Sequence, residues 1–181
     1  MKKFVTTKPK LSFLQDGSPY SEQYSDFYFD SESGYQQSEE IFIHGNKIPT
    51  KIAEKNNILT IAETGFGTGL NFLLTIQAYQ RVQRKYPNKN LTTVNFISLE
   101  KYPLSKAQLT TSLNALPELN EHTQLLLEQY PDIEFSTNKE NQFEASFFNG
   151  KVSLTLIVDD AAQGLSTLKS DKNGLVDVWY L

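Results

Sequence analysis

The sequence predicts an α/β fold built on a doubly wound sheet, and two observations support this prediction. The short apolar run 58–62 is typical of a buried parallel strand, and it ends in Glu63 and then in alternating glycines. A second β-rich run, 93–99, ends in Glu100 after an intervening helical segment. Acidic ends on neighbouring parallel strands are typical of sheets that bind nucleosides at their carboxyl edge.

The glycines Gly65, Gly67 and Gly69 fall in the turn between the first strand and a helix-compatible segment that begins at Leu70. Glycine lets the backbone approach a ligand closely because it carries no Cβ. The spacing is G-x-G-x-G, whereas a dinucleotide fingerprint requires its third glycine at the position of Leu70. S-adenosylmethionine (SAM) therefore fits better than NAD, and a nicotinamide oxidoreductase ranks below it. An ordinary glycine-rich turn is the alternative.

The acidic strand ends are the other candidate cofactor contacts. We expect Glu63 to orient the glycine loop and the methionine end of the cofactor, and Glu100 to accept from the ribose hydroxyls. A third strand, 152–158, ends at Asp160, which is a candidate for the adenine amino group. Asp160 could equally cap a helix over 161–168. The expected architecture is thus a Rossmann-like fold that binds SAM, as in SAM-dependent methyltransferases.

The remaining segments complete the expected order of elements. Hairpins are expected over 41–52 and 144–158, because His44-Gly45-Asn46 and Asn149-Gly150 read as turns. Helices are expected over 105–115 and 117–130, which begin with Ser and Pro. The strand signal at 175–181 stops at Leu181, which would leave an unpaired sheet edge. We therefore expect a fragment: an N-terminal extension with a hairpin over 1–57, and a core over 58–181 truncated before its later strands.

Composition narrows the possible functions. With 181 residues, 39% of them apolar, the chain is long enough for one globular domain. It contains no cysteine, and His44 and His122 are too few and too far apart to suggest a metal site, so we expect both on the surface. It has no twenty-residue apolar span and no signal-peptide pattern, which predicts a cytoplasmic protein without a membrane partner. The net charge of −4 provides no global attraction to nucleic acid.

Four motifs together resemble the methyltransferase half of the MnmC family, over nearly the whole chain. They are Asp26-Phe-Tyr-Phe-Asp30, Glu63-Thr-Gly-Phe-Gly-Thr-Gly-Leu-Asn-Phe-Leu73, Phe96-Ile-Ser-Leu-Glu-Lys-Tyr-Pro-Leu104 and Val176-Asp-Val-Trp-Tyr-Leu181. The resemblance implies that SAM methylates the aminomethyl group of 5-aminomethyl-2-thiouridine at the tRNA wobble position, giving 5-methylaminomethyl-2-thiouridine. It also makes tRNA the partner.

The same resemblance bears on individual residues. It makes Tyr28 and Phe29 candidates for the substrate side. The family's presumed catalytic aspartate follows the closing strand, so it would lie just after Leu181 and this chain would contain no catalytic residue. Many members of the family fuse this half to an FAD-dependent oxidase, so FAD is implied only if the native protein has that half.

Two alternatives stay open on the sequence. A SAM-dependent N-methyltransferase of a small amine would share every cofactor feature, and it would suit the acidic pI of about 5.2 better. A non-catalytic module that binds a nucleoside would also use the glycine loop. Salt-sensitive binding of tRNA would distinguish the first alternative from the family reading.

Overall fold

A five-stranded sheet forms the centre of the computed structural model, which describes residues 8–54, 58–131, 142–168 and 176–181. The strand order is β6-β7-β5-β4-β8, and β6 alone of these strands is antiparallel to its neighbour. The bounds are Ile58–Thr64 for β4, Thr93–Glu100 for β5, Gln142–Phe147 for β6, Val152–Val158 for β7 and Val178–Tyr180 for β8. The four expected parallel strands are confirmed, as is the hairpin of β6 and β7.

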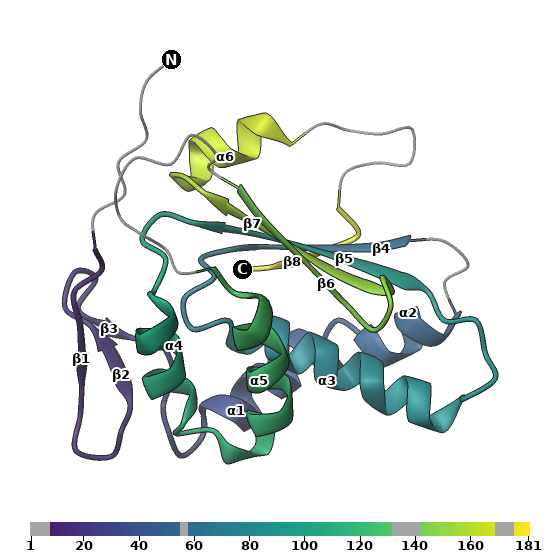
Figure 1. Cartoon of the computed structure of the whole chain (residues 1–181), viewed down its shortest axis with the longest axis horizontal. Helices are drawn as coiled ribbons and strands as arrows, with labels where there is room; N and C mark the ends of the chain where they lie inside the picture. Colours follow the sequence, from purple (N-terminus) through teal and green to yellow (C-terminus); the bar gives the residue numbers. More distant parts are fainter. Residues whose placement is uncertain (1–7, 55–57, 132–141, 169–175) are drawn as a thin grey trace.

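Helices cover the sheet unequally. Figure 1 shows α3 (Leu70–Lys85), α4 (Lys106–Leu113) and α5 (Asn120–Gln129) below the sheet and α6 (Ala161–Thr167) above it. The short 3-10 helix η2, Pro117–Leu119, precedes α5. Ser105 begins α4 as expected, because its hydroxyl accepts from the Gln108 backbone N–H while the Gln108 side chain accepts from the Ser105 N–H. Expected helices and observed helices therefore agree after β5.

The N-terminal part forms a small sheet and a helical segment. The strands β1 (Leu11–Phe13), β2 (Pro19–Ser21) and β3 (Asp26–Phe27) pair in antiparallel order. They are followed by α1 (Gly34–Ser38), the π-helix η1 (Glu39–His44) and α2 (Ile48–Glu54). The antiparallel strands of the N-terminal part thus lie in 11–27, where no hairpin was expected.

The hairpin predicted over 41–52 is wrong, because burial in this segment follows a helical period. Ile48 and Ile52 lie one helical turn apart and are fully buried, whereas Ile41 is 59% exposed. Gly45 has φ −55 and continues the helical path, so it does not provide the positive φ that a two-residue hairpin turn needs. Pro49 is tolerated because it lies in the first turn of α2.

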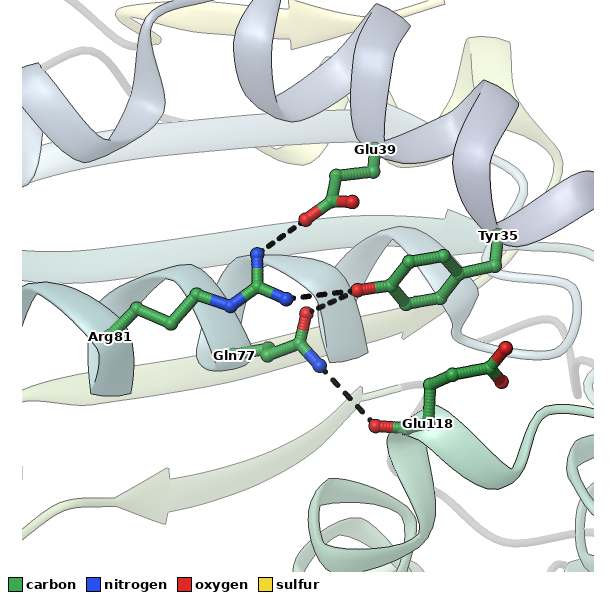
Figure 2. A network of polar contacts seen from close by, with 5 residues as sticks. All are labelled: Tyr35, Glu39, Gln77, Arg81 and Glu118. Carbon is green, nitrogen blue, oxygen red and sulfur yellow. Dashed lines mark hydrogen bonds and ion pairs between the residues drawn. The ribbon is translucent and has the colours of Figure 1, made fainter.

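A polar network joins α1 and η1 to α3, as Figure 2 shows. The Tyr35 hydroxyl donates to Gln77 Oε1 at 2.8 Å and accepts from Arg81 Nη2 at 3.0 Å. Arg81 also forms an ion pair with Glu39, and Gln77 Nε2 donates to the Glu118 carbonyl at 3.3 Å. One of the basic residues near the end of α3 is therefore occupied in holding the fold together.

Buried side chains from both parts of the chain belong to one hydrophobic core, which extends from Phe29 and Tyr35 to Tyr180. His122 belongs to this interior as well, since it is 4% exposed and its Nε2 lies 3.0 Å from Gln80 Oε1. The expected surface position of His122 is therefore wrong, because α5 packs this side of the helix on α3; His44 is exposed as expected. Among the helices described, none is long and apolar enough to cross a membrane.

Candidate functional site

The glycine loop lies at the carboxyl edge of the sheet, between β4 and α3. Gly65, Gly67 and Gly69 have φ values of 93°, 53° and 76°, a region that other residues rarely adopt. A Cβ added at Gly65 would meet no heavy atom of the described residues within 4 Å, so among these residues the loop faces free space there. The Gly65 N–H donates to the Leu99 carbonyl at 2.7 Å, which joins the loop to the neighbouring strand β5. The loop can therefore admit a ligand directly against its backbone.

Glu100 at the end of β5 anchors this loop. Its Oε2 accepts from the Gly67 N–H at 2.9 Å, and its Oε1 accepts from the Tyr102 N–H at 2.7 Å. Each carboxylate oxygen has a further lone pair, so the group can still accept from a ligand hydroxyl. The hydrogen bond from the glycine loop thus goes to Glu100, while the orienting role expected of Glu63 stays a prediction.

Glu63 at the end of β4 is 2% exposed and contacts α3. Its Oε2 accepts from Asn71 Nδ2 at 3.2 Å. Neither Glu63 Oε1 nor Ser98 Oγ, which are both buried, has a hydrogen-bond partner in the part of the chain that the structure describes. Burial raises the pKa of Glu63 to about 8, because the loss of water outweighs the opposing effects of the nearby Ser98 hydroxyl and of the bond from Asn71. The group is therefore mostly a neutral acid near pH 7, and its Oε1, beside the Ser98 hydroxyl of its register partner, makes no hydrogen bond of good geometry within the described residues.

Tyr180 of β8 is the register partner of Glu63 and extends this buried polar group. Its hydroxyl lies 3.3 Å from Thr75 Oγ1 of α3. Burial raises the pKa of Tyr180 well above its usual range, and the nearby Glu63 adds to this shift. The end of β8 thus reaches the same edge of the sheet as the glycine loop.

The two aromatic candidates of the N-terminal motif separate in the structure. Tyr28 is half-buried and contacts the glycine loop, since a Cβ at Gly67 would lie 3.0 Å from Tyr28 Cδ1. Phe29 is 6% exposed in the hydrophobic core and packs against Gly34. Of the two, only Tyr28 lies beside the glycine loop.

Asp160 begins α6 and serves as its N-cap. Its Oδ1 accepts from the Ala162 N–H at 3.1 Å, and its Oδ2 pairs with Lys101 Nζ at 3.1 Å. The bond from Lys101 and then the bond from the Ala162 backbone lower the pKa of Asp160. Of the two expected roles the cap is present, while a contact with adenine stays a prediction.

The residues present fit a nucleoside cofactor such as SAM. The loop has free space before Gly65, and Glu63 has a buried oxygen without a partner. Sequence reasoning missed Asn71 and Tyr102, which donate to the two carboxyl groups, and Tyr180, which lies beside Glu63 in the sheet. Asn71 and Tyr102 lie within the motifs already quoted, but no local pattern shows which carboxyl group each of them contacts. Nothing in the described residues groups three or more metal-ligating side chains.

A mostly parallel sheet with a left-handed glycine loop after one strand and a carboxylate after the next is typical of Rossmann-like folds. The crystal structure of MnmC2 from Aquifex aeolicus shares this fold, with a TM-score of 0.64 over 96% of this chain and 48% of that chain, at 22% identity. No model of a protein family matches the chain. The sequence itself narrows the class further.

Over nearly its whole length the chain is similar to members of the MnmC family. Its relatives are named tRNA 5-methylaminomethyl-2-thiouridine biosynthesis bifunctional protein MnmC. The protein from Marinomonas sp. (strain MWYL1) is 37% identical over 96% of this chain, and that from Pseudoalteromonas translucida (strain TAC 125) is 35% identical over 94%. The protein from Pseudomonas savastanoi pv. phaseolicola is 36% identical over 98%. The chain spans about a quarter of the length of these relatives, from 24% to 26%.

Proposed function

We propose that this chain is the SAM-dependent methyl-transfer part of an enzyme that modifies the tRNA wobble uridine. The reaction is methylation of the aminomethyl group of 5-aminomethyl-2-thiouridine, which gives 5-methylaminomethyl-2-thiouridine. The observation that carries the proposal is the glycine loop, whose backbone faces free space at Gly65 beside Glu63 and Glu100. The naming of relatives that match more than nine-tenths of the chain supports this substrate.

Each site residue has a proposed role. The glycines let the cofactor approach the backbone, Glu100 accepts from the ribose hydroxyls, and Glu63 offers its free oxygen to the methionine end. Asp160 is proposed for the adenine amino group. Bound SAM supplies an electrophilic methyl group. The protein contributes mainly by holding donor and amine in line, an effect worth many orders of magnitude in rate.

The position of β8 fits the proposed substrate side. Tyr180 lies beside Glu63, so a residue that follows Leu181 in a longer protein would leave the sheet at the carboxyl edge. The aspartate that the family resemblance implies after Leu181 would thereby lie near the amine, where it could accept the amine proton.

We further propose tRNA as the partner, a cytoplasmic location, and a division into an N-terminal extension, 1–57, and a cofactor core, 58–181.

Calorimetric titration of SAM and of NAD into the 181-residue chain tests the cofactor. We expect SAM to bind and NAD not to bind. Gly65→Ala should abolish SAM binding, because the alanine methyl group would occupy the space in which the cofactor approaches the loop backbone. Gly150→Ala is the matched control: Gly150 has a similar φ of 81° but lies in the β6–β7 turn, so this variant should keep SAM binding at a similar cost in stability. Absence of SAM binding by the unmodified chain would refute the cofactor assignment.

Transfer of a labelled methyl group from SAM tests the substrate, with the protein continued beyond Leu181. We expect transfer to tRNA that carries the aminomethyl uridine, no transfer to tRNA that lacks it, and a strong decrease with rising salt. Salt-independent methylation of free small amines would instead support the small-amine enzyme. Binding of SAM without transfer to either substrate would support a non-catalytic module.

A further inference from the structure

The small N-terminal sheet provides a side chain that contacts the cofactor loop. Tyr28 directly follows β3, and its backbone N–H donates to the Pro19 carbonyl at 2.9 Å, which fixes its position relative to β2. A Cβ at Gly67 would lie 3.0 Å from Tyr28 Cδ1 and 3.4 Å from Cε1. The tyrosine ring therefore occupies the space that a side chain at position 67 would need, and it lies over the loop at Gly67.

The contacted residue lies at the centre of the loop. The Gly67 N–H donates to Glu100 Oε2 at 2.9 Å, and its φ of 53° lies in the left-handed region. The adjoining turn is held separately, since the Gly69 N–H donates to the Phe66 carbonyl at 2.7 Å. The peptide at Gly67 is therefore bound by Glu100 through its N–H, and the Tyr28 ring lies on the side where a side chain at position 67 would be.

Tyr28 and Glu100 also interact electrostatically. Burial raises the pKa of Tyr28 and the charge of Glu100 raises it further, while a hydrogen bond with the Ser21 side chain lowers it in part, so the hydroxyl stays neutral near pH 7. Glu100 is itself 9% exposed, and low access to water strengthens a charged hydrogen bond such as the one from Gly67.

We propose that Tyr28 is a positioning residue, which holds Gly67 and through it Glu100 in the geometry that receives the nucleoside part of the cofactor. The N-terminal sheet is then a component of the cofactor site, although β4 and the loop come much later in the chain. The ligand in this inference rests on the proposed function, whereas the order of the loop can be measured without any ligand.

Amide hydrogen exchange, followed by NMR on the ligand-free chain, tests the loop directly. In Tyr28→Ala we expect the Gly67 amide to exchange about tenfold faster relative to the amide of Phe96 in β5, which reports global unfolding. Tyr28→Phe keeps the ring and should stay within about twofold of the unmodified chain. Phe27→Ala is the matched control, because Phe27 is the preceding residue, is 48% exposed and contacts Tyr20 of the same small sheet.

Calorimetric titration of SAM into the same variants tests the consequence. We expect the Kd to rise about tenfold in Tyr28→Ala, which corresponds to about 1.4 kcal/mol, and to return in Tyr28→Phe. Unchanged exchange at Gly67 in Tyr28→Ala, or equal acceleration in Phe27→Ala, would overturn the proposal. If Tyr28→Ala does not fold, Tyr28→Leu, which keeps apolar bulk without the ring, is measured with the same expected direction. Acceleration at Gly67 in a chain that does not bind SAM would support the loop role and refute only the proposed function.

Discussion

Substitution of Glu63 by glutamine should remove a large pH dependence of stability. Burial raises the pKa of Glu63 from its ordinary 4.5 to about 8, so the folded state binds this proton more tightly than the unfolded chain does. The stabilising contribution is complete below pH 4.5 and is lost as the pH rises through about 8. One proton corresponds to about 1.4 kcal/mol per pH unit, and the total loss is at most about 5 kcal/mol. Glutamine imitates the neutral acid and should avoid this loss.

Urea unfolding at pH 5, 6, 7, 8 and 9 measures the effect, with Trp179 fluorescence and circular dichroism as probes. We expect the free energy of unfolding of Glu63→Gln, relative to the unmodified chain, to increase steadily up to about pH 8 and then to level off. Glu54→Gln, which changes an exposed carboxylate in α2, is the control and should follow the unmodified chain. Parallel curves for Glu63→Gln and the unmodified chain would show that the buried carboxyl group is already ionised, and would refute the reasoning.

Three further predictions concern other groups. Asp160→Ala should destabilise α6 while Asp160→Asn keeps the cap; if both variants weaken SAM binding by calorimetry, the adenine role is supported, and unchanged binding contradicts it. Burial lowers the pKa of His122, so its contribution to stability is complete above pH 6.5 and is lost as the pH falls below that value. In urea titrations, the free energy of unfolding of His122→Gln should therefore decrease less below pH 6.5 than that of the unmodified chain. An equal decrease in both would contradict this prediction. Gly69→Ala should cost about 1–3 kcal/mol in thermal unfolding, because its Cβ would lie 2.8 Å from Phe66 Cζ at a φ of 76°; a smaller cost would mean that the Phe66 ring moves aside.

The elements that sequence reasoning placed correctly have strong local signals. β4, β5 and β7 are short apolar runs that end at an acidic or turn residue, and the Ser105 cap has its partner Gln108 three residues later. The prediction of a hairpin over 41–52 was wrong because the local turn signal, Gly45-Asn46, competes with a helical burial pattern. The effect of that pattern depends on packing against α3. Burial of Ile48 and Ile52 decided that competition.

The candidate site divides in the same way. Glycines after a strand and carboxylates at strand ends depend on backbone conformation and residue spacing, and both are local properties that the order of amino acids already contains. The free oxygen of Glu63, the bond from Gly67 to Glu100 and the ring of Tyr28 on Gly67 depend on which surfaces meet. Burial, protonation and loop order follow from contacts between segments far apart in the chain, because the loss of water around a group depends on everything packed against it.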